Sequence, residues 1–346
     1  MTIAVHAAAH LPALDVDSYN EELRDDEGFV GDRARKGAFR AIIENWRRSL
    51  RRAGRDPFGD EASDLISKKK LDEVLIDGEP EAKGVLHGAI EDFAQELALV
   101  VRRFLRLKTW KDTERIVMGG GFRASRVGEL VIGRTAVLLK VDGIDLEILP
   151  VRHHSHEAGL IGAVHLSPSW MFEAHDAILA VDIGGTNIRA GVLRLNLKRA
   201  PDLAKAAVWK FELWRHGDER LNREDAVDGL VRMLQRLIAR ADKEGVRLAP
   251  FIGIGCPGRI EWDGSIHRGA QNLPGNWESS TFNLPARLRR AIPRIGGHEA
   301  AIVMHNDAVV QGLSELPFMR DIKHWGVFTI GTGLGNAHFT NRTSEP

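Results

Sequence analysis

The chain has 346 residues, with 48 lysines and arginines against 48 aspartates and glutamates, so its formal net charge is zero. A balanced charge gives no general attraction to nucleic acid or to an anionic membrane surface. The single cysteine, Cys256, excludes a disulfide framework and a cysteine-based zinc site. The length predicts two domains, and the lack of a leader-like start or a long apolar run predicts a cytoplasmic protein.

The first 55 residues carry a weak pattern followed by a basic one. Residues 2–9 could form a short strand, and residues 15–27 are expected to be a polar connection. Residues 31–55 place apolar side chains at helical spacing among many arginines and lysines, which predicts an amphipathic helix. A nucleic-acid or membrane contact is the alternative, but a solvated basic face whose long side chains cover a core stripe is favoured.

Residues 65–166 alternate between helical and strand patterns, which is typical of an α/β layer. Gly119, Gly120 and Gly121 follow one expected strand, where a nucleotide could approach the backbone or where a plain tight turn would serve equally. The neighbouring histidines at 153, 154 and 156 could suggest a metal site, but surface histidines near a helix start are favoured. The expected helices cover 65–75, 81–105, 127–139 and 156–166, and the expected strands cover 115–118 and 146–149.

The segment 178–193 carries the most specific local signal in the chain. A buried strand brings Asp182 to its end, and Gly184 with Gly185 allows a tight turn before a second apolar strand. Backbone N–H groups in such a turn form a nest for phosphate oxygens, and Thr186 would add a hydroxyl donor. Asp182 stands where a carboxylate could hold magnesium through water. An ordinary glycine hairpin is the alternative.

The C-terminal part repeats this theme twice. An apolar strand over 301–306 ends at Asp307 and precedes a helix, and a strand over 325–330 enters a second glycine turn at 331–335. Two phosphate nests and one carboxylate suit phosphoryl transfer, which needs clamped phosphates and an acceptor hydroxyl relieved of its proton. Asp307 is therefore the candidate general base. Between the repeats we expect a strand within 198–214, a helix over 226–241, a strand over 251–256 and a polar loop over 269–277.

Five segments together resemble the ROK (repressor, ORF, kinase) sugar kinases, such as bacterial glucokinases, in order and approximate spacing over residues 176–340. The resemblance implies an actin-like ATPase (ribonuclease H-like) α/β fold of two closing domains, and an ATP- and magnesium-dependent kinase of a sugar or polyol. The matching segments are Asp182–Asn187, Gly253–Gly258, Gln271–Trp277, Asn306–Asp307 and Gly331–Gly335.

The resemblance also assigns roles to residues. Asp307 would be the general base, Asp182 would organise magnesium, and Asn272, Asn306 and Gly258 would face the sugar. The family's cysteine-rich zinc loop and its Glu and His sugar ligands are absent here, so no zinc is expected, and Glu27 or Asp32 could replace part of that wall. Phosphate or nucleotide contacts would come from Gly184, Gly185, Thr186, Asn187, Gly331, Thr332, Gly333, Gly119, Gly120 and Gly121.

The order of the segments departs from the family. There, a long nucleotide-binding half follows the second phosphate loop, whereas here segments similar to its adenosine loop (116–121) and terminal helix (156–163) precede Asp182. We therefore expect a circular permutation, joined through residues 167–176, with Pro346 in the same domain as residues 1–165. The expected domains are a nucleotide-binding domain at 1–166 plus 319–346 and a domain at 167–318 that carries the catalytic aspartate. An unrelated helical domain fused to a truncated kinase is the alternative.

The predicted activity is transfer of a phosphoryl group from ATP to a hydroxyl of a sugar or polyol. The expected partner is a small-molecule sugar or polyol substrate, and neither nucleic acid nor a membrane is expected. The chain could also form a homodimer. A non-catalytic, sugar-sensing transcriptional regulator of the same family is the alternative. Such regulators usually add an N-terminal helix-turn-helix, for which the basic helix at 33–53 is the only stand-in in the sequence.

Overall fold

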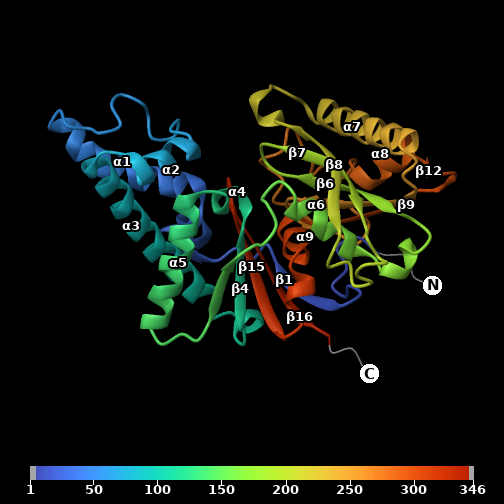
Figure 1. Cartoon of the computed structure of the whole chain (residues 1–346), viewed down its shortest axis with the longest axis horizontal. Coiled ribbons are helices and arrows are strands. Elements are labelled where there is room, and N and C mark those ends of the chain that lie inside the picture. Colours follow the sequence, from blue (N-terminus) through green and yellow to red (C-terminus); the bar gives the residue numbers. More distant parts are fainter. Residues whose placement is uncertain (1–4, 343–346) are drawn as a thin grey trace. The chain divides into compact units, whose positions relative to one another are not determined.

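A computed structural model describes residues 5–342 (Figure 1). The chain divides into two compact units. Within the described residues, unit 1 comprises 5–20, 152–323 and 337–342, and unit 2 comprises 21–151 and 324–336.

Unit 1 is built on a five-stranded sheet in the order β14-β9-β6-β7-β8. β6 (Ala177–Ile183) and β7 (Ile188–Arg194) form an antiparallel hairpin, and β8 (Ala207–Trp214) runs antiparallel to β7. β9 (Leu248–Cys256) lies parallel to β6, and β14 (Ala301–Asn306) lies parallel to β9. Every residue of β6 is buried, which explains why its sequence is an apolar run without alternation.

Helices cover both faces of this sheet (Figure 1). α7 (Arg223–Lys243) and α8 (Leu284–Ala291) share one core with β6, β7, β9 and β14. α6 (Ala158–Gly162) and α9 (Asp307–Leu313) contact each other and the other face. They approach closely because Gly162 has no side chain, and a Cβ there would lie 1.7 Å from the Val310 carbonyl oxygen.

The second sheet has the order β1-β16-β15-β4-β5. β1 (Leu14–Tyr19) pairs antiparallel with β16 (Leu334–Asn341), and β4 (Arg115–Gly119) lies parallel to both β15 (His324–Ile330) and β5 (Glu147–Pro150). The division between the units falls within β16.

The expectation of a polar connection over 15–27 is wrong for its first part, because β1 occupies it. Leu14 and Val16 alternate as buried residues, and Val16 is paired with Phe339. The partner strand lies at the far end of the chain, so no neighbouring segment of sequence announces it. The short strand considered for residues 2–9 does not appear in its described part, 5–9; residues 2–4 lie outside the described residues.

Unit 2 packs its helices around a small aromatic cluster. The rings of Phe39, Phe93 and Phe122 contact one another at centroid distances of 5.2 to 5.4 Å. The basic helix is confirmed and turns one face inward: its buried Arg47 donates to Asp56, Ser63 and the Gly59 carbonyl. The helices are α1 (Lys36–Arg52), α2 (Lys68–Asp77), α3 (Pro80–Phe104), α4 (Gly120–Arg123) and α5 (Arg126–Val141).

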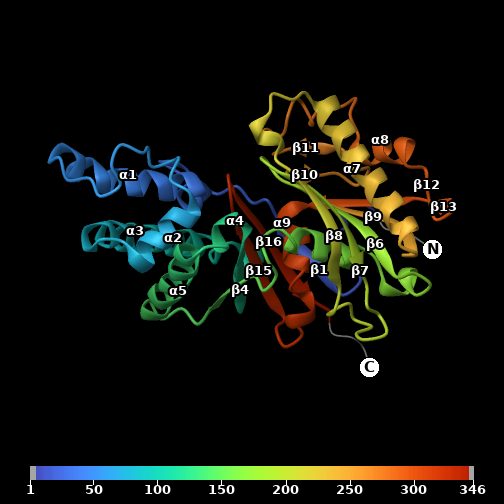
Figure 2. The same cartoon turned by 45° about the horizontal axis from the view of Figure 1, so that its top comes forward.

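Shorter elements complete the chain, and several are labelled in Figure 2. Sequence patterns did not predict the two-residue and three-residue strands, because so few residues carry no usable period. These short strands are β2 (Arg24–Asp25), β3 (Gly28–Phe29), β10 (Arg259–Ile260), β11 (Ile266–Arg268), β12 (Arg294–Ile295) and β13 (His298–Glu299). The 3-10 helices are Val30–Ala34, Lys108–Trp110, Ala163–Leu166, Ser169–Phe172, His216–Asp218 and Leu316–Phe318.

The two large sheets share one plan. Each has a hairpin (β6-β7 or β15-β16), a third antiparallel strand (β8 or β1) and two strands parallel to the first (β9 and β14, or β4 and β5). This is the duplicated plan of the actin-like, ribonuclease H-like fold that the resemblance implied. The α/β class and this fold are confirmed.

The two compact units have other boundaries than the two expected domains, which were 1–166 plus 319–346 and 167–318. Unit 1 groups 152–166 with β6 because α6 packs there. That one expected domain binds nucleotide and the other carries the catalytic aspartate stays a prediction. The expected place of Pro346 in the domain of residues 1–165 also stays a prediction, because Pro346 lies outside the described residues. Near that end, Arg342 donates its backbone N–H to the Ala13 carbonyl. Over residues 5–342, no helix combines the length and the apolar character needed to cross a membrane.

Candidate functional site

Two carboxylates lie at the carboxyl edge of the unit 1 sheet. Asp182 is the penultimate residue of β6 and is in register with Gly255 of β9. Asp307 directly follows β14, whose last residue is in register with Cys256. Because β6, β9 and β14 are parallel, their ends share one edge, where ligands bind in open α/β sheets. The structure therefore brings together the predicted magnesium residue and the predicted base.

Asp182 is buried in an ion pair that sequence reasoning missed. Its Oδ2 lies 2.8 Å from Nη1 of Arg189, its register partner in β7, and Arg189 Nε donates to His156 Nδ1 at 3.1 Å. Gly159 of α6 faces the carboxylate, and a Cβ there would lie 2.6 Å from Asp182 Cγ. The hairpin register was the available signal for Arg189, since residues directly opposite each other in a hairpin are neighbours.

Asp307 is the first residue of α9 and is half-buried. Burial, and then the negative charge of Asp182, raise the pKa of Asp307 to about 7. A general base works best when its pKa lies near the operating pH, so this carboxylate is suited to take a proton from a hydroxyl. Burial and the same two carboxylates raise the pKa of the nearby Cys256 thiol, which keeps it neutral.

Asn306 and Gly258, both predicted to face the sugar, lie beside Asp307 and contact each other. Asn306 Oδ1 accepts from the backbone N–H groups of Ala308 and Val309, and its Nδ2 donates to the Gly258 carbonyl at 3.0 Å. Asn306 thus caps α9 and ties it to the turn after β9. Gly258 has φ +97°, and a Cβ there would lie 2.5 Å from the Arg268 carbonyl oxygen. Their contact with a sugar stays a prediction.

The turn between β6 and β7 is closed and supported from two sides. The Gly184 N–H donates to the Asn187 carbonyl at 2.8 Å, and the Gly184 carbonyl lies 2.8 Å from Nε2 of the buried His216. Gly185 faces the predicted sugar loop, since a Cβ there would lie 3.1 Å from Asn272 Cβ. His216 was not predicted, because a single histidine in a polar segment carries no sequence signal.

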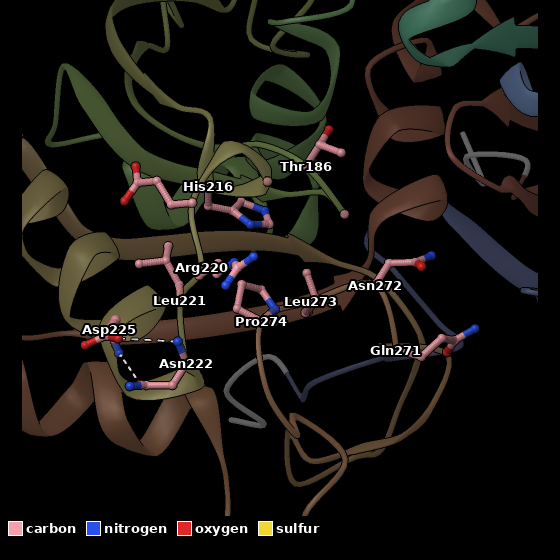
Figure 3. Close-up of a pocket in the computed structure, with 13 residues that line it drawn as sticks. Thr186, His216, Arg220, Leu221, Asn222, Asp225, Gln271, Asn272, Leu273 and Pro274 are labelled. Atoms are coloured by element: carbon pink, nitrogen blue, oxygen red, sulfur yellow. Dashed lines mark hydrogen bonds between the residues drawn. The ribbon is translucent and has the colours of Figure 1, made fainter. Parts of the chain in front are cut away.

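A pocket of about 710 Å³ opens beside this turn (Figure 3). The volume is within the range of small-molecule sites. Thr186 and Asn272, two predicted site residues, form part of its wall. The segment 216–222 before and at the start of α7 provides most of the other side. The lining residues are Gly185, Thr186, His216, Gly217, Glu219, Arg220, Leu221, Asn222, Asp225, Gln271, Asn272, Leu273 and Pro274.

The other predicted glycine segments meet in unit 2. Gly120, with φ +83°, lies against the end of β15, where a Cβ would come within 2.4 Å of the Ile330 carbonyl oxygen. Gly331 donates its N–H to the Gly333 carbonyl at 2.9 Å and accepts from the Lys36 N–H at 3.0 Å. The segments 119–121 and 331–333 thus form one backbone-lined surface at the carboxyl ends of β4 and β15.

Glu27 and Asp32 lie in unit 2, and both are paired with arginines: Glu27 with Arg33 at 2.7 Å and Asp32 with Arg35 at 3.3 Å. Among residues 5–342, no three His, Cys, Asp or Glu side chains are grouped so that they could hold a metal by themselves.

Comparisons with known proteins gave structural matches only: no family model and no curated protein matches the chain. Similar solved structures include a ROK hexokinase from Thermus thermophilus (23% identity, TM-score 0.28, covering 38% of this chain and 35% of that one). They also include a ROK-family glucokinase from Streptomyces griseus, solved with glucose and AMPPNP (21%, 0.36, 48% and 45%). An exopolyphosphatase from Cytophaga hutchinsonii is a third (16%, 0.23, 52% and 52%). The chain thus spans less than half the length of the two kinases.

Proposed function

We propose that the chain is an ATP-dependent phosphotransferase that acts on a hydroxyl of a sugar or sugar-like polyol, with Asp307 as the general base. The observation that supports this most is the carboxyl edge of the unit 1 sheet. There Asp307, with a pKa of about 7, shares the edge with Asp182 and with the glycine turn that follows Asp182. Phosphoryl transfer needs little more than positioned phosphates, a cation and a base for the acceptor hydroxyl.

The residues around Asp182 suit magnesium as a cofactor. Mg²⁺ prefers oxygen ligands, keeps several waters, and is usually held by one or two carboxylates together with substrate phosphates. Asp182 provides such a carboxylate directly before the turn whose backbone would hold phosphate. When bound, the cation would offset the negative charge of the phosphates.

The residues of the chain itself would bind the phosphates and the acceptor and would take up the proton of the acceptor hydroxyl. Asp307 would accept the proton of the acceptor hydroxyl. The Gly184–Asn187 turn would hold phosphate oxygens through backbone N–H groups other than that of Gly184, which donates to the Asn187 carbonyl. Thr186, Asn272 and Gln271 place hydroxyl and amide groups in the pocket beside that turn, which suits a polyol rich in hydrogen-bonding groups. In unit 2, the segments 119–121 and 331–333 are the proposed nucleotide contacts.

We also propose that the chain is a circular permutant of this fold. In the unit 1 sheet, the strands β6, β7, β8, β9 and β14 follow one another along the chain. The equivalent strands of the second sheet are β15, β16, β1, β4 and β5, so only a join from the C-terminus to the N-terminus would put them in the same order. α6, which follows β5, packs against α9, which follows β14, as expected for equivalent terminal helices.

A screen for ADP release with Mg·ATP tests the function, using hexoses, N-acetylhexosamines and inositols as acceptors. We expect acceptor-dependent release from at least one class and its loss in Asp307→Asn. Release without any acceptor would indicate hydrolysis instead. No release with any polyol, together with salt-sensitive binding to DNA, would favour the transcriptional regulator.

A further inference from the structure

The carboxyl edge of the unit 1 sheet carries an unequal balance of charge. Asp182 and Asp307 both lie there, and the negative charge of Asp182 acts on Asp307. Among the described residues, Asp182 forms an ion pair with one cationic partner, Arg189, whose Nη1 is 2.8 Å from Oδ2. The side chains of this pair are 12% and 10% exposed. A buried carboxylate needs such a partner, since an uncompensated buried charge is strongly destabilising.

The two partners differ in their freedom to move. Gly159 of α6 faces Asp182 so closely that even a Cβ would lie 2.6 Å from its Cγ and 2.7 Å from its Oδ1. The carboxylate is therefore held between α6 and β7. Arg189 has a long side chain, and its Nε is already bonded to His156 Nδ1 at 3.1 Å, on the side of α6. If the pair separates, the guanidinium is the group that moves.

A divalent cation and a guanidinium compete at such a site. Both are attracted to the same carboxylate, and they repel each other strongly at a few ångströms in a poorly solvated place. Arg189 is the second residue of β7, immediately after the turn at 184–187. A guanidinium released from Asp182 would therefore be near any phosphate in that turn, and its planar fork matches phosphate oxygens.

We propose that Arg189 is a resident counter-ion that neutralises Asp182 in the empty site, is displaced from it by the incoming divalent cation, and then turns to the phosphate in the 184–187 turn. This rests on the proposed function in two respects, namely that Asp182 holds the cation and that the 184–187 turn holds phosphate. Arg189 is thus a positioning residue, and His156 limits how far its guanidinium travels. The Asp182–Arg189 pair is neutral in the empty site, and the cation and the phosphate enter together.

Cation binding and thermal unfolding of Arg189→Met test this without any acceptor. In EDTA, the variant should unfold at a lower temperature than the wild type, because Asp182 loses its partner. Mn²⁺ alone, measured by electron paramagnetic resonance, should bind about tenfold more tightly to the variant or better, because one repelling charge is gone. With ADP present the gain should be smaller, because the variant also lacks the guanidinium that turns to the phosphate. Added Mn²⁺ should raise the unfolding temperature of the variant more than that of the wild type.

Matched variants separate the charge from general damage. Arg194→Met alters the same residue type in the same strand, but Arg194 lies over the Trp209 ring, 5.3 Å from its centroid, so Mn²⁺ affinity should not change. Arg189→Lys keeps a charge and should give an intermediate affinity. In Asp182→Asn/Arg189→Met, added Mn²⁺ should give no extra stability. Weaker Mn²⁺ binding by Arg189→Met, or unchanged binding, would overturn the proposal.

A measurement on the wild type covers the case in which Arg189→Met does not fold. The guanidinium nitrogen resonances of Arg189 should shift on titration with Mg²⁺ and ADP, with the midpoint of cation binding, while those of Arg194 stay in place. Resonances of Arg189 that do not respond while Mg²⁺ binds would contradict displacement. If these effects appear but no polyol is phosphorylated, the proposed function fails alone. If polyols are phosphorylated but Arg189 does not respond, only this inference fails.

Discussion

The two large sheets have the same strand plan but end in different chemistry. At the carboxyl edge of the β14-β9-β6-β7-β8 sheet stand two acidic side chains, Asp182 and Asp307, together with a turn closed by Gly184. The corresponding edge of β4 and β15 presents the backbone of 119–121 and 331–333, packed so closely that a Cβ at Gly120 would strike the Ile330 carbonyl. The same plan thus ends in two carboxylates in one unit and in a backbone surface in the other.

The strongest test of this contrast is Asp307→Asn. The amide cannot accept the proton of the acceptor hydroxyl, so kcat should fall by about 10²- to 10⁴-fold. The affinity for ATP should change little, because the predicted nucleotide contacts in unit 2 are untouched. Steady-state kinetics and equilibrium binding of ATP check both statements. A variant that keeps wild-type kcat would remove Asp307 from the chemistry.

The backbone surface of unit 2 can be tested with two adjacent glycines. Gly120→Ala forces a side chain into the left-handed region and against the Ile330 carbonyl, which should cost about 2–4 kcal/mol of unfolding free energy and weaken ATP binding. Gly121→Ala is the control, since nothing lies within 4 Å of its added Cβ. Denaturant unfolding and ATP binding should separate the two variants. Equal behaviour would mean that this backbone needs no close approach.

The pKa of Asp307 predicts how activity depends on pH. The base must be ionised, so kcat/KM for the acceptor should fall about tenfold for each pH unit on the acid side and level off above the pKa of Asp307. With the cation on Asp182, that pKa should lie below about 7 but above the ordinary value of 3.8, because burial is the larger cause of the shift. The profile measured from pH 5.5 to 9 with a fixed Mg·ATP concentration checks this. A limb that lies near pH 4 instead would show that Asp307 is not desolvated in the working enzyme.

The smallest expected effect is on stability. The folded-state pKa of Asp307 is raised from 3.8 to about 7, so the folded state binds more protons between those values, and this contribution to stability is lost as pH rises through about 7. Asp307→Asn lacks the buried charge and should be about 1–3 kcal/mol more stable than the wild type at pH 8.5. At pH 4 the difference should be small. An offset that is the same at both pH values would contradict the raised pKa.

The sequence predicted those parts whose signal is local. The buried strand before Asp182, the glycine turn after it, and the strand that ends at Asp307 each show their pattern within about ten residues, and the structure has all three. The long apolar helix over 81–105 was equally clear and is α3. For such elements, burial and period are properties of the segment itself.

The missed parts depend on partners that are distant in sequence. β1 was read as a connection because its partner strand, β16, lies at the opposite end of the chain. Arg189 was missed because only the hairpin register shows that it lies opposite Asp182. His216 was missed because only the folded chain places its ring next to the Gly184 carbonyl. The features that distinguish the carboxyl edges of the two sheets therefore depend largely on tertiary contacts, which the sequence pattern does not reveal.

We propose that this chain transfers a phosphoryl group to an alcohol with Asp307 as the base. A single-turnover experiment with γ-labelled ATP, Mg²⁺ and the best acceptor of the screen tests it directly, by following the label at pH 8. We expect the label on the polyol in the wild type, whereas Asp307→Asn should bind ATP but transfer the label at least about 10²-fold more slowly. Label that appears only as inorganic phosphate, or equal rates in the two proteins, would contradict it.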